Sequence, residues 1–239
     1  MKSILSVALL VGLGLSGSAV QAWDTMPNCG ASTFPATGQT ESYPAFTLDG
    51  GIAVQDDGAV RAGGALSYTG TGPTIIDNNT GLEWEVLGQP DTINVGAGSP
   101  HDYRTRYWWS CPNFLGIAMC FDNMSIWDKV VLLNGEGGVG YAGHNDWRVP
   151  NIKELMSIVD YEAFDPAVDS AFFNRPSAGC TVLTCSATAT NGSYWSSTTN
   201  VLNSTFAWAV EFFTGGVLID HKVNPHFVRA VRGGCLPGG

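Results

Sequence analysis

The stretch GHNDWRVPNIKELMSIVDY, residues 143–161, decides the fold, because it joins a polar loop to a well-marked helix start. Asn151 is a favourable N-cap, and Glu154, three residues later, completes a capping box. The apolar residues that follow share one helical face: Ile152, Leu155, Met156 and Val159. The pattern predicts a short amphipathic helix packed on a core, with Pro150 just outside it.

The Trp-Arg pair before this helix admits two interpretations, a reactive or ligand-binding constellation and a structural anchor. Trp147 stands where a large apolar side chain would fix the loop to the core. Arg148 has a carboxylate or loop carbonyls as its natural partners. We favour the structural interpretation for both residues.

A second helix is predicted in SIWDKVVLLNGEGG, residues 125–138. Ser125 is a suitable N-cap, Asp128 stands at the favourable third position, and Asn134-Gly135 ends the helix. The residues expected on its inward face are Trp127, Val130 and Val131.

The remaining periodic segments predict strands. In TIIDNNTGLEWEVLG, residues 74–88, two short strands flank the turn at residues 77–81, and the second alternates apolar and acidic residues. SYWSST, residues 193–198, is a strand candidate. FAWAVEFFTGGVLIDHK, residues 206–222, predicts a hairpin that turns at residues 214–216. In the last strand, at residues 226–234, Arg229 and Arg232 are the polar positions, and we expect Trp195 and Trp208 in the core.

The N-terminal residues divide the chain into three parts. Lys2, an apolar run at residues 4–15 and the small-x-small pattern at residues 20–22 predict a signal peptide over residues 1–22. Residues 23–73 form a Gly/Thr-rich extension without helical periodicity, and residues 74–235 form the main domain. The protein is therefore expected to be exported, to the extracellular space, the cell surface or the periplasm.

Export makes disulfides the natural state of the six cysteines. Six cysteines allow fifteen pairings, and spacing favours one of them. The expected bridges are Cys29–Cys235, Cys111–Cys120 and Cys180–Cys185. Zinc binding is disfavoured, because the cysteines lack paired two-residue gaps and have no neighbouring histidine.

The charge balance excludes one class of partner. The chain has 11 Lys+Arg and 21 Asp+Glu, a net charge of −10 at pH 7. Removal of the signal peptide takes away Lys2 and no acid, so −10 becomes −11. Such a chain repels phosphate and sulfate polymers at long range, so nucleic acid is not an expected partner.

The order of the motifs resembles the Lcl C-terminal domain family, named for a Legionella collagen-like adhesin. The resemblance covers roughly residues 74–234 and is carried by DNNTGLEW, DWRVPNIKEL, YWSST and VRAVRGG, in this order. TGQTESY and the later DDG are similar to the leader segment that precedes this domain. One departure is Ala230, where the family often has cysteine.

The resemblance implies an α+β domain with a C-type lectin-like fold, related to the group of the formylglycine-generating enzyme. Two helices would flank a small twisted antiparallel sheet, and long disulfide-pinned loops would carry any ligand. In such a fold the DWR segment joins the two helical regions. Trp84, Trp147, Arg148 and Trp195 are then structural residues.

We predict a non-enzymatic binding or adhesion module that recognises a glycan or an extracellular protein through its loops. The candidate ligand-binding residues are aromatic or polar loop residues: Tyr107, Trp108, Trp109, Asn200, Asn203, Asn224 and His226. The alternative for most of these aromatic residues is a place in the core. The family's founding adhesin is associated with sulfated polysaccharides and a trimer, but the negative charge favours neutral glycans or a protein partner here, with a homo-oligomer left open.

Two other functions are weighed. An enzyme of the formylglycine-generating type needs an activated cysteine, and the expected disulfides leave none. A displayed variable protein of a diversity-generating retroelement would vary at Asn200, Asn203 and Asn224. No catalytic residues and no membrane span are predicted.

No metal or other cofactor is assigned. The QPD triplet at residues 89–91 matches the galactose-type triplet of calcium lectins, but it precedes both helices and is interpreted as coincidence. Calcium stays open at Asp165 and Asp169.

Overall fold

The computed structural model of the chain describes residues 34–42, 48–49, 52–53, 56–88, 100–110, 113–114, 117–118, 124–173 and 186–234. The proposed signal peptide, the QPD triplet and all six cysteines lie outside these residues, so the disulfide pairing stays a prediction.

Strands predominate over helices among the described residues, and the expected α+β class is confirmed. The helices are α1 (Asp57–Val60), α2 (Ile126–Gly135) and α3 (Ile152–Met156), with the 3-10 helices η1 (Glu136–Gly138) and η2 (Tyr141–Gly143). The strands are β1 (Leu48–Asp49), β2 (Ile52–Ala53), β3 (Tyr68–Gly70), β4 (Thr74–Asp77), β5 (Leu82–Glu85), β6 (Tyr107–Trp108), β7 (Asn113–Phe114), β8 (Ile117–Ala118), β9 (Ser193–Thr199), β10 (Phe206–Glu211), β11 (Val217–His221), β12 (Pro225–His226) and β13 (Val231–Gly233).

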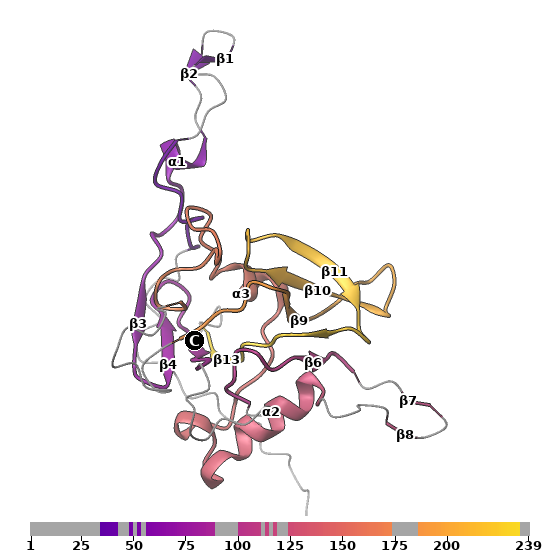
Figure 1. Ribbon diagram of the computed structural model, residues 1–239. Helices are drawn as coiled ribbons and strands as arrows, with labels where there is room; N and C mark the ends of the chain where they lie inside the picture. Colours follow the sequence, from indigo (N-terminus) through magenta and orange to yellow (C-terminus); the bar gives the residue numbers. More distant parts are fainter. Residues whose placement is uncertain are drawn as a thin grey trace, which may run out of the picture.

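Two sheets and one short strand pair organise the domain (Figure 1). One sheet has the order β13-β5-β4-β3, the other has the order β11-β10-β9, and β12 pairs with β6. All of these neighbours are antiparallel. β13, the last of the described strands, pairs with β5. This sheet therefore connects segments that are far apart in the sequence.

Both predicted helix starts are confirmed, and both carry capping boxes. The Ser125 hydroxyl accepts from the Asp128 amide at 3.2 Å, and the Asp128 carboxylate accepts from the Ser125 amide at 2.8 Å. Asn151 and Glu154 exchange the same pair of bonds, at 3.0 and 2.8 Å. α3 ends at Met156, which is exposed, so this member of the predicted inward face is wrong.

The predicted inward face of α2 is wrong for Trp127 and Val131, whereas Val130 packs against the core as expected. Trp127 is 42% exposed and Val131 is 71% exposed. The buried residues are Ile126, Lys129 and Leu133. The charged Lys129 occupies an inward position because the buried Glu85 carboxylate pairs with it. The pattern of apolar residues in α2 does not reveal this pair.

The hairpin β10–β11 forms where expected, but Trp208 does not lie in the core as predicted. Trp208 is 36% exposed and pairs in register with Ile219, which is 42% exposed. Inside, the fully buried Trp195 of β9 lies opposite Ala209. The indole fills this layer of the core, so alanine fits beside it and Trp208 faces outward.

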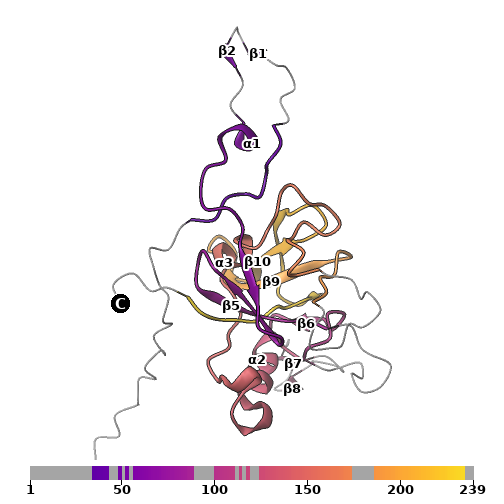
Figure 2. The ribbon, with the colours of Figure 1, turned by 90° about the vertical axis from the view of Figure 1, so that its left-hand side faces the viewer.

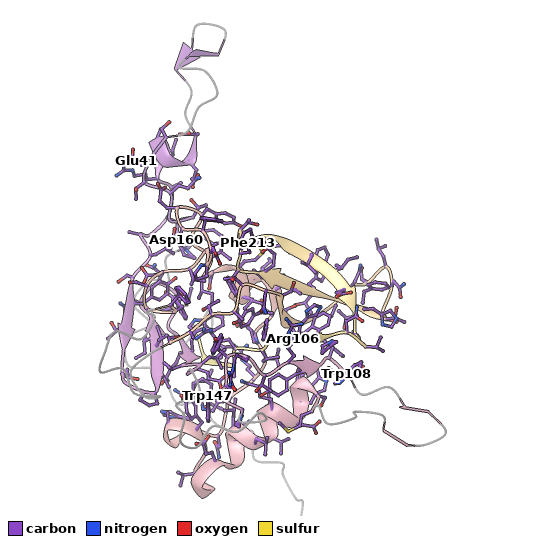
Figure 3. All side chains as sticks on the ribbon, in the orientation of Figure 1. Glu41, Arg106, Trp108, Trp147, Asp160 and Phe213 are labelled. Carbon is purple, nitrogen blue, oxygen red and sulfur yellow. The ribbon has the colours of Figure 1, made fainter. Side chains whose placement is uncertain are left out.

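The described residues 34–42 and 56–66, called the leader here, contact each other and the domain. Thr37 hydrogen-bonds to Asp57, and a Cβ on Gly58 would stand 1.8 Å from the Glu41 carbonyl oxygen, so TGQT and DDG interlock. The backbone amide of Tyr161 donates to the Thr37 carbonyl at 2.8 Å. Figures 1 and 2 show α1 projecting beyond the sheets, and Figure 3 labels Asp160 near the base of this projection.

Candidate functional site

The pairing of β6 with β12 brings four of the predicted ligand-binding residues into one region. Pro225 lies opposite Trp108 and His226 lies opposite Tyr107. Figure 3 labels Trp108 beside β6. We call the residues around this pair the β6–β12 surface: Trp108, Trp109, Trp127, Lys222, Asn224 and His226.

Trp109 is the centre of this surface. Its indole Nε1 donates to the Ser196 carbonyl at 2.9 Å. The Lys222 ammonium lies 3.7 Å from the centroid of the Trp109 ring, and Trp127 meets the ring edge-on at 5.1 Å. Trp109 is therefore held in place, and Trp127, from the first turn of α2, presents the more exposed indole.

Asp220 connects the polar part of the surface. It accepts a hydrogen bond from the Asn224 amide at 2.8 Å and lies 2.6 Å from Nε2 of His226. Burial lowers the pKa of His226 despite this carboxylate. Burial alone would raise the pKa of Asp220, but the bonds from His226, the His221 amide and Asn224 hold it below its usual value. Both shifts favour a neutral imidazole that donates to a carboxylate.

The other predicted ligand-binding residues do not contribute side chains to this surface. Tyr107 is only 1% exposed, and its ring lies 5.3 Å from the Lys129 ammonium inside the core. Asn200 is buried and accepts from the Leu202 amide, so it shapes the β9–β10 loop. Asn203 is exposed on the same loop and accepts from Thr205.

The motif residues lie in the scaffold. Trp84, Trp147 and Trp195 are almost fully buried. The Trp147 indole donates to the Tyr141 carbonyl at 2.9 Å, and Figure 3 labels it above α2. Arg148 forms two hydrogen bonds of 2.7 Å with the Glu154 carboxylate.

A buried ionic cluster lies beneath α2 and was not foreseen from the sequence. The Lys129 ammonium lies 3.0 and 2.9 Å from the two Glu85 oxygens, and both side chains are fully buried. His101 bridges Glu85 at 3.0 Å and Glu136 at 2.9 Å. Burial alone would raise the pKa of Glu85, but Lys129 and His101 outweigh it and hold the pKa below its usual value.

The position of His101 predicts a pH dependence of stability. Burial alone would lower the pKa of His101, but Glu85 and Glu136 outweigh burial and the repulsion from Lys129, so the pKa is raised. Because the pKa of His101 is higher in the folded state, the stabilisation that His101 supplies is complete below its unfolded-state pKa. This stabilisation is lost as pH rises through the folded-state pKa. We expect urea titrations between about pH 5 and about pH 9 to show this loss in the wild type but not in His101→Gln.

His144 supplies the matched control for this prediction, because its side chain forms no ion pair with the described residues. His144→Gln should keep the pH dependence of the wild type. An unchanged pH profile in His101→Gln would contradict the assignment.

Arg229 is a second buried charge, at a position that the sequence marked only as polar. Its guanidinium donates to the Glu85 carbonyl at 2.9 Å and the Ala187 carbonyl at 2.7 Å, and also to the hydroxyls of Ser186 and Thr188. Arg232, the other predicted polar position, is also buried and pairs with Glu83 and Asp146. These arginines are inside because carbonyls and carboxylates from distant segments satisfy their donors.

A cavity of about 670 Å³ opens beside the residues that lead into β6. Arg104 and Arg106 line it together with Asp165, residues 187–190, Asn191 and aromatic side chains that include Tyr103 and Phe227. Of these residues, the sequence pointed only to Asp165, as a possible calcium ligand. The available signal was YRTRYWW, residues 103–109, which places two arginines close together in an acidic chain.

No group of three or more His, Cys, Asp or Glu side chains among the described residues is arranged to hold a metal ion. The Asp169 carboxylate accepts from the Ala171 amide at 2.7 Å, and Asp165 lies at the cavity. In the part of the chain that the structure describes, no helix has the length and apolar character needed to cross a membrane.

The comparison with protein families supports the resemblance. The family model described as the Lcl C-terminal domain matches residues 73–232. The comparison with curated proteins gives no match.

Proposed function

Because the chain belongs to the Lcl C-terminal domain family, we propose that it is an exported binding module of the adhesin kind. In this proposal the domain has a C-type lectin-like fold and recognises a glycan or an extracellular protein through its loops. The fold alone does not define the ligand, so the proposal rests on the β6–β12 surface.

The observation that carries the proposal is the edge-on pair of Trp109 and Trp127. Trp109 is fixed by its bond to Ser196 and by Lys222, so the pair is ordered before any ligand arrives. Trp127 offers its ring to solvent, and an exposed indole stacks well on the apolar face of a sugar. Because the two indoles are ordered in advance, binding loses less conformational entropy.

Polar groups beside the indoles suit hydroxyl-rich ligands. The exposed Asn224 is held by Asp220, and the Lys222 ammonium donates to the Thr199 hydroxyl at 2.8 Å. One cation and one carboxylate lie together here, so the surface has no strong excess of positive charge. We propose neutral glycans or a protein, and not a sulfated polymer, as the ligand of this surface.

We propose that the module works without catalysis. In the His226–Asp220 pair, Nε2 faces the carboxylate, and Nδ1 is buried without a partner. In the His101 cluster, each imidazole nitrogen faces a carboxylate. Neither histidine of these described pairs presents an accessible nitrogen that could act as a general base on a bound ligand.

A glycan array probed with the purified mature chain, followed by titration of the best neutral glycan, tests the proposal. Trp127→Ala is expected to weaken binding about tenfold, because a central indole commonly supplies about 1.4 kcal/mol or more at a binding surface. The fold should be retained, because Trp127 is well exposed on the first turn of α2.

Val131→Ala is the matched control, since Val131 lies one turn further along the exposed face of α2. It should bind as the wild type does. Equal affinities of Trp127→Ala and wild type would remove the indole pair from the proposal, and an array without any bound glycan would leave only its protein-binding form, to be checked with extracellular proteins.

A further inference from the structure

We infer that the cavity beside β6 is a second binding site and that it takes a single carboxylated sugar unit. The cavity shares no residue with the β6–β12 surface, so the inference goes beyond the proposed adhesion function. Its volume of about 670 Å³ lies in the usual range of small-molecule sites.

Arg106 is held in a fixed orientation at this cavity. Its guanidinium carbon lies 4.7 Å from the centroid of the Phe227 ring, and one Nη2 hydrogen is donated to the Asn191 carbonyl at 2.9 Å. Gly192 leaves the room for this arrangement, because a Cβ there would stand 3.1 Å from Phe227 and 3.3 Å from Arg106. The guanidinium is therefore oriented before a ligand binds.

The charge of Arg106 has no carboxylate partner among the described residues, in contrast to the charges of Lys129, Arg148 and Arg232. Lys129 pairs with Glu85, Arg148 with Glu154, and Arg232 with Glu83 and Asp146. A guanidinium has five donors in a planar fork, and Arg106 uses one of them on a carbonyl. The planar fork matches the two oxygens of a carboxylate.

Arg104 adds a second guanidinium to the same cavity. It is separated from Arg106 by one residue and also lines the cavity. Its guanidinium binds the buried Asp102 carboxylate at 3.1 and 3.2 Å, while more than half of the Arg104 side chain is exposed. Asp102 thus fixes Arg104 at the rim and leaves part of its fork directed to solvent.

Asp165 limits which anions the cavity can bind. Asp165 lines the cavity, and its exposed side chain accepts no hydrogen bond from a described residue. A densely charged chain would be repelled by this group, whereas a hydroxyl can donate to it. The rings of Tyr103 and Phe227 and the side chain of Asn191 add apolar and polar contacts of the kind that sugars use. A ligand with one carboxylate and several hydroxyls would match the arginines, Asp165, Asn191 and the aromatic rings of this cavity.

Calorimetric titration of the full mature chain with N-acetylneuraminic acid and with glucuronic acid tests the inference. At least one of these acids should bind, and its methyl ester, which lacks the charge, should bind at least tenfold more weakly. Arg106→Gln should lose tenfold or more in affinity, since a charge-assisted pair is replaced by a neutral contact. Arg104→Gln, at an exposed position, should lose a smaller factor and covers the case in which Arg106→Gln fails to fold.

Lys153→Gln is the control, because it removes one positive charge from an exposed position of α3 outside the cavity. It should bind as the wild type does, and so should Trp127→Ala, which separates this site from the adhesion surface. Titration with a glycan that ends in the preferred acid shows whether the site binds the free sugar acid or the same sugar at the end of a glycan chain. Binding of neither acid, equal binding of acid and methyl ester, tighter binding of glucose 6-sulfate, or unchanged affinity in both arginine variants would overturn the inference.

Discussion

Replacing Lys129 by methionine is expected to lower the free energy of unfolding by about 3–5 kcal/mol, because it leaves the buried Glu85 carboxylate without its cation. Lys129 also donates to the Pro100 carbonyl at 2.6 Å, so the substitution removes a second buried contact. His101 and the Ala230 amide still bind Glu85, but His101 is shared with Glu136 and does not replace the Lys129 ammonium. Urea unfolding followed by circular dichroism measures the loss.

The double variant Glu85→Gln/Lys129→Met separates the ion pair from simple packing. It should be clearly more stable than Lys129→Met alone, because no uncompensated charge is then buried. Lys153→Met, at an exposed site, should change stability by less than about 1 kcal/mol. If Lys129→Met were as stable as Lys153→Met, the buried pair would not hold the core together.

Replacing Arg229 by methionine is expected to lower the free energy of unfolding by about 3–5 kcal/mol. Its four hydrogen bonds join β5, at the Glu85 carbonyl, to the segment at residues 186–188. Methionine fills part of the space but donates nothing, so buried acceptors lose their donors. The Ala187 amide, which donates to the Leu87 carbonyl at 2.7 Å, should also exchange its hydrogen faster, because Arg229 no longer holds this segment.

Lys153→Met, which removes an exposed cation of α3, is the control for this prediction as well and should change stability by less than about 1 kcal/mol. Urea unfolding and amide hydrogen exchange of both variants give the comparison. Arg229→Met with a loss below about 1 kcal/mol and unchanged exchange at Ala187 would show that the buried guanidinium is dispensable.

The parts of the fold that the sequence predicted are those encoded by neighbouring residues. Ser125 and Asp128, or Asn151 and Glu154, are three residues apart, so each capping box is visible in the sequence. The turn between β4 and β5 is encoded in the same local way, by the hydrogen bond from the Thr80 hydroxyl to Asp77 at 2.6 Å.

The errors concern contacts between distant segments. Lys129 was given no inward place because its partner Glu85 is 44 residues away, and Arg229 bonds to Ala187 across 42 residues. Trp208 was assigned to the core because alternation does not tell which of two faces is buried. Trp195, on a neighbouring strand, decides that question.

The sequence predicted only part of the candidate site, because the site also depends on contacts between distant segments. Trp109 and His226 were selected by residue type, and the β6–β12 pairing brings their segments together. The cavity combines residues 103–106, 187–191 and Phe227, which no local pattern connects. Trp127 was missed as a surface residue because helical spacing assigned it to the core.

The position of β3 determines where a usable fragment of this protein can begin. The family match begins at residue 73, but β3 covers the free edge of β4 from residues 68–70, within the part assigned to the N-terminal extension. A recombinant chain started at residue 73 would leave the backbone amides and carbonyls of β4 open to pairing with another molecule, which is a route to aggregation. A recombinant fragment that begins before the leader would instead retain β3, which protects this edge, and the contact between Thr37 and Tyr161.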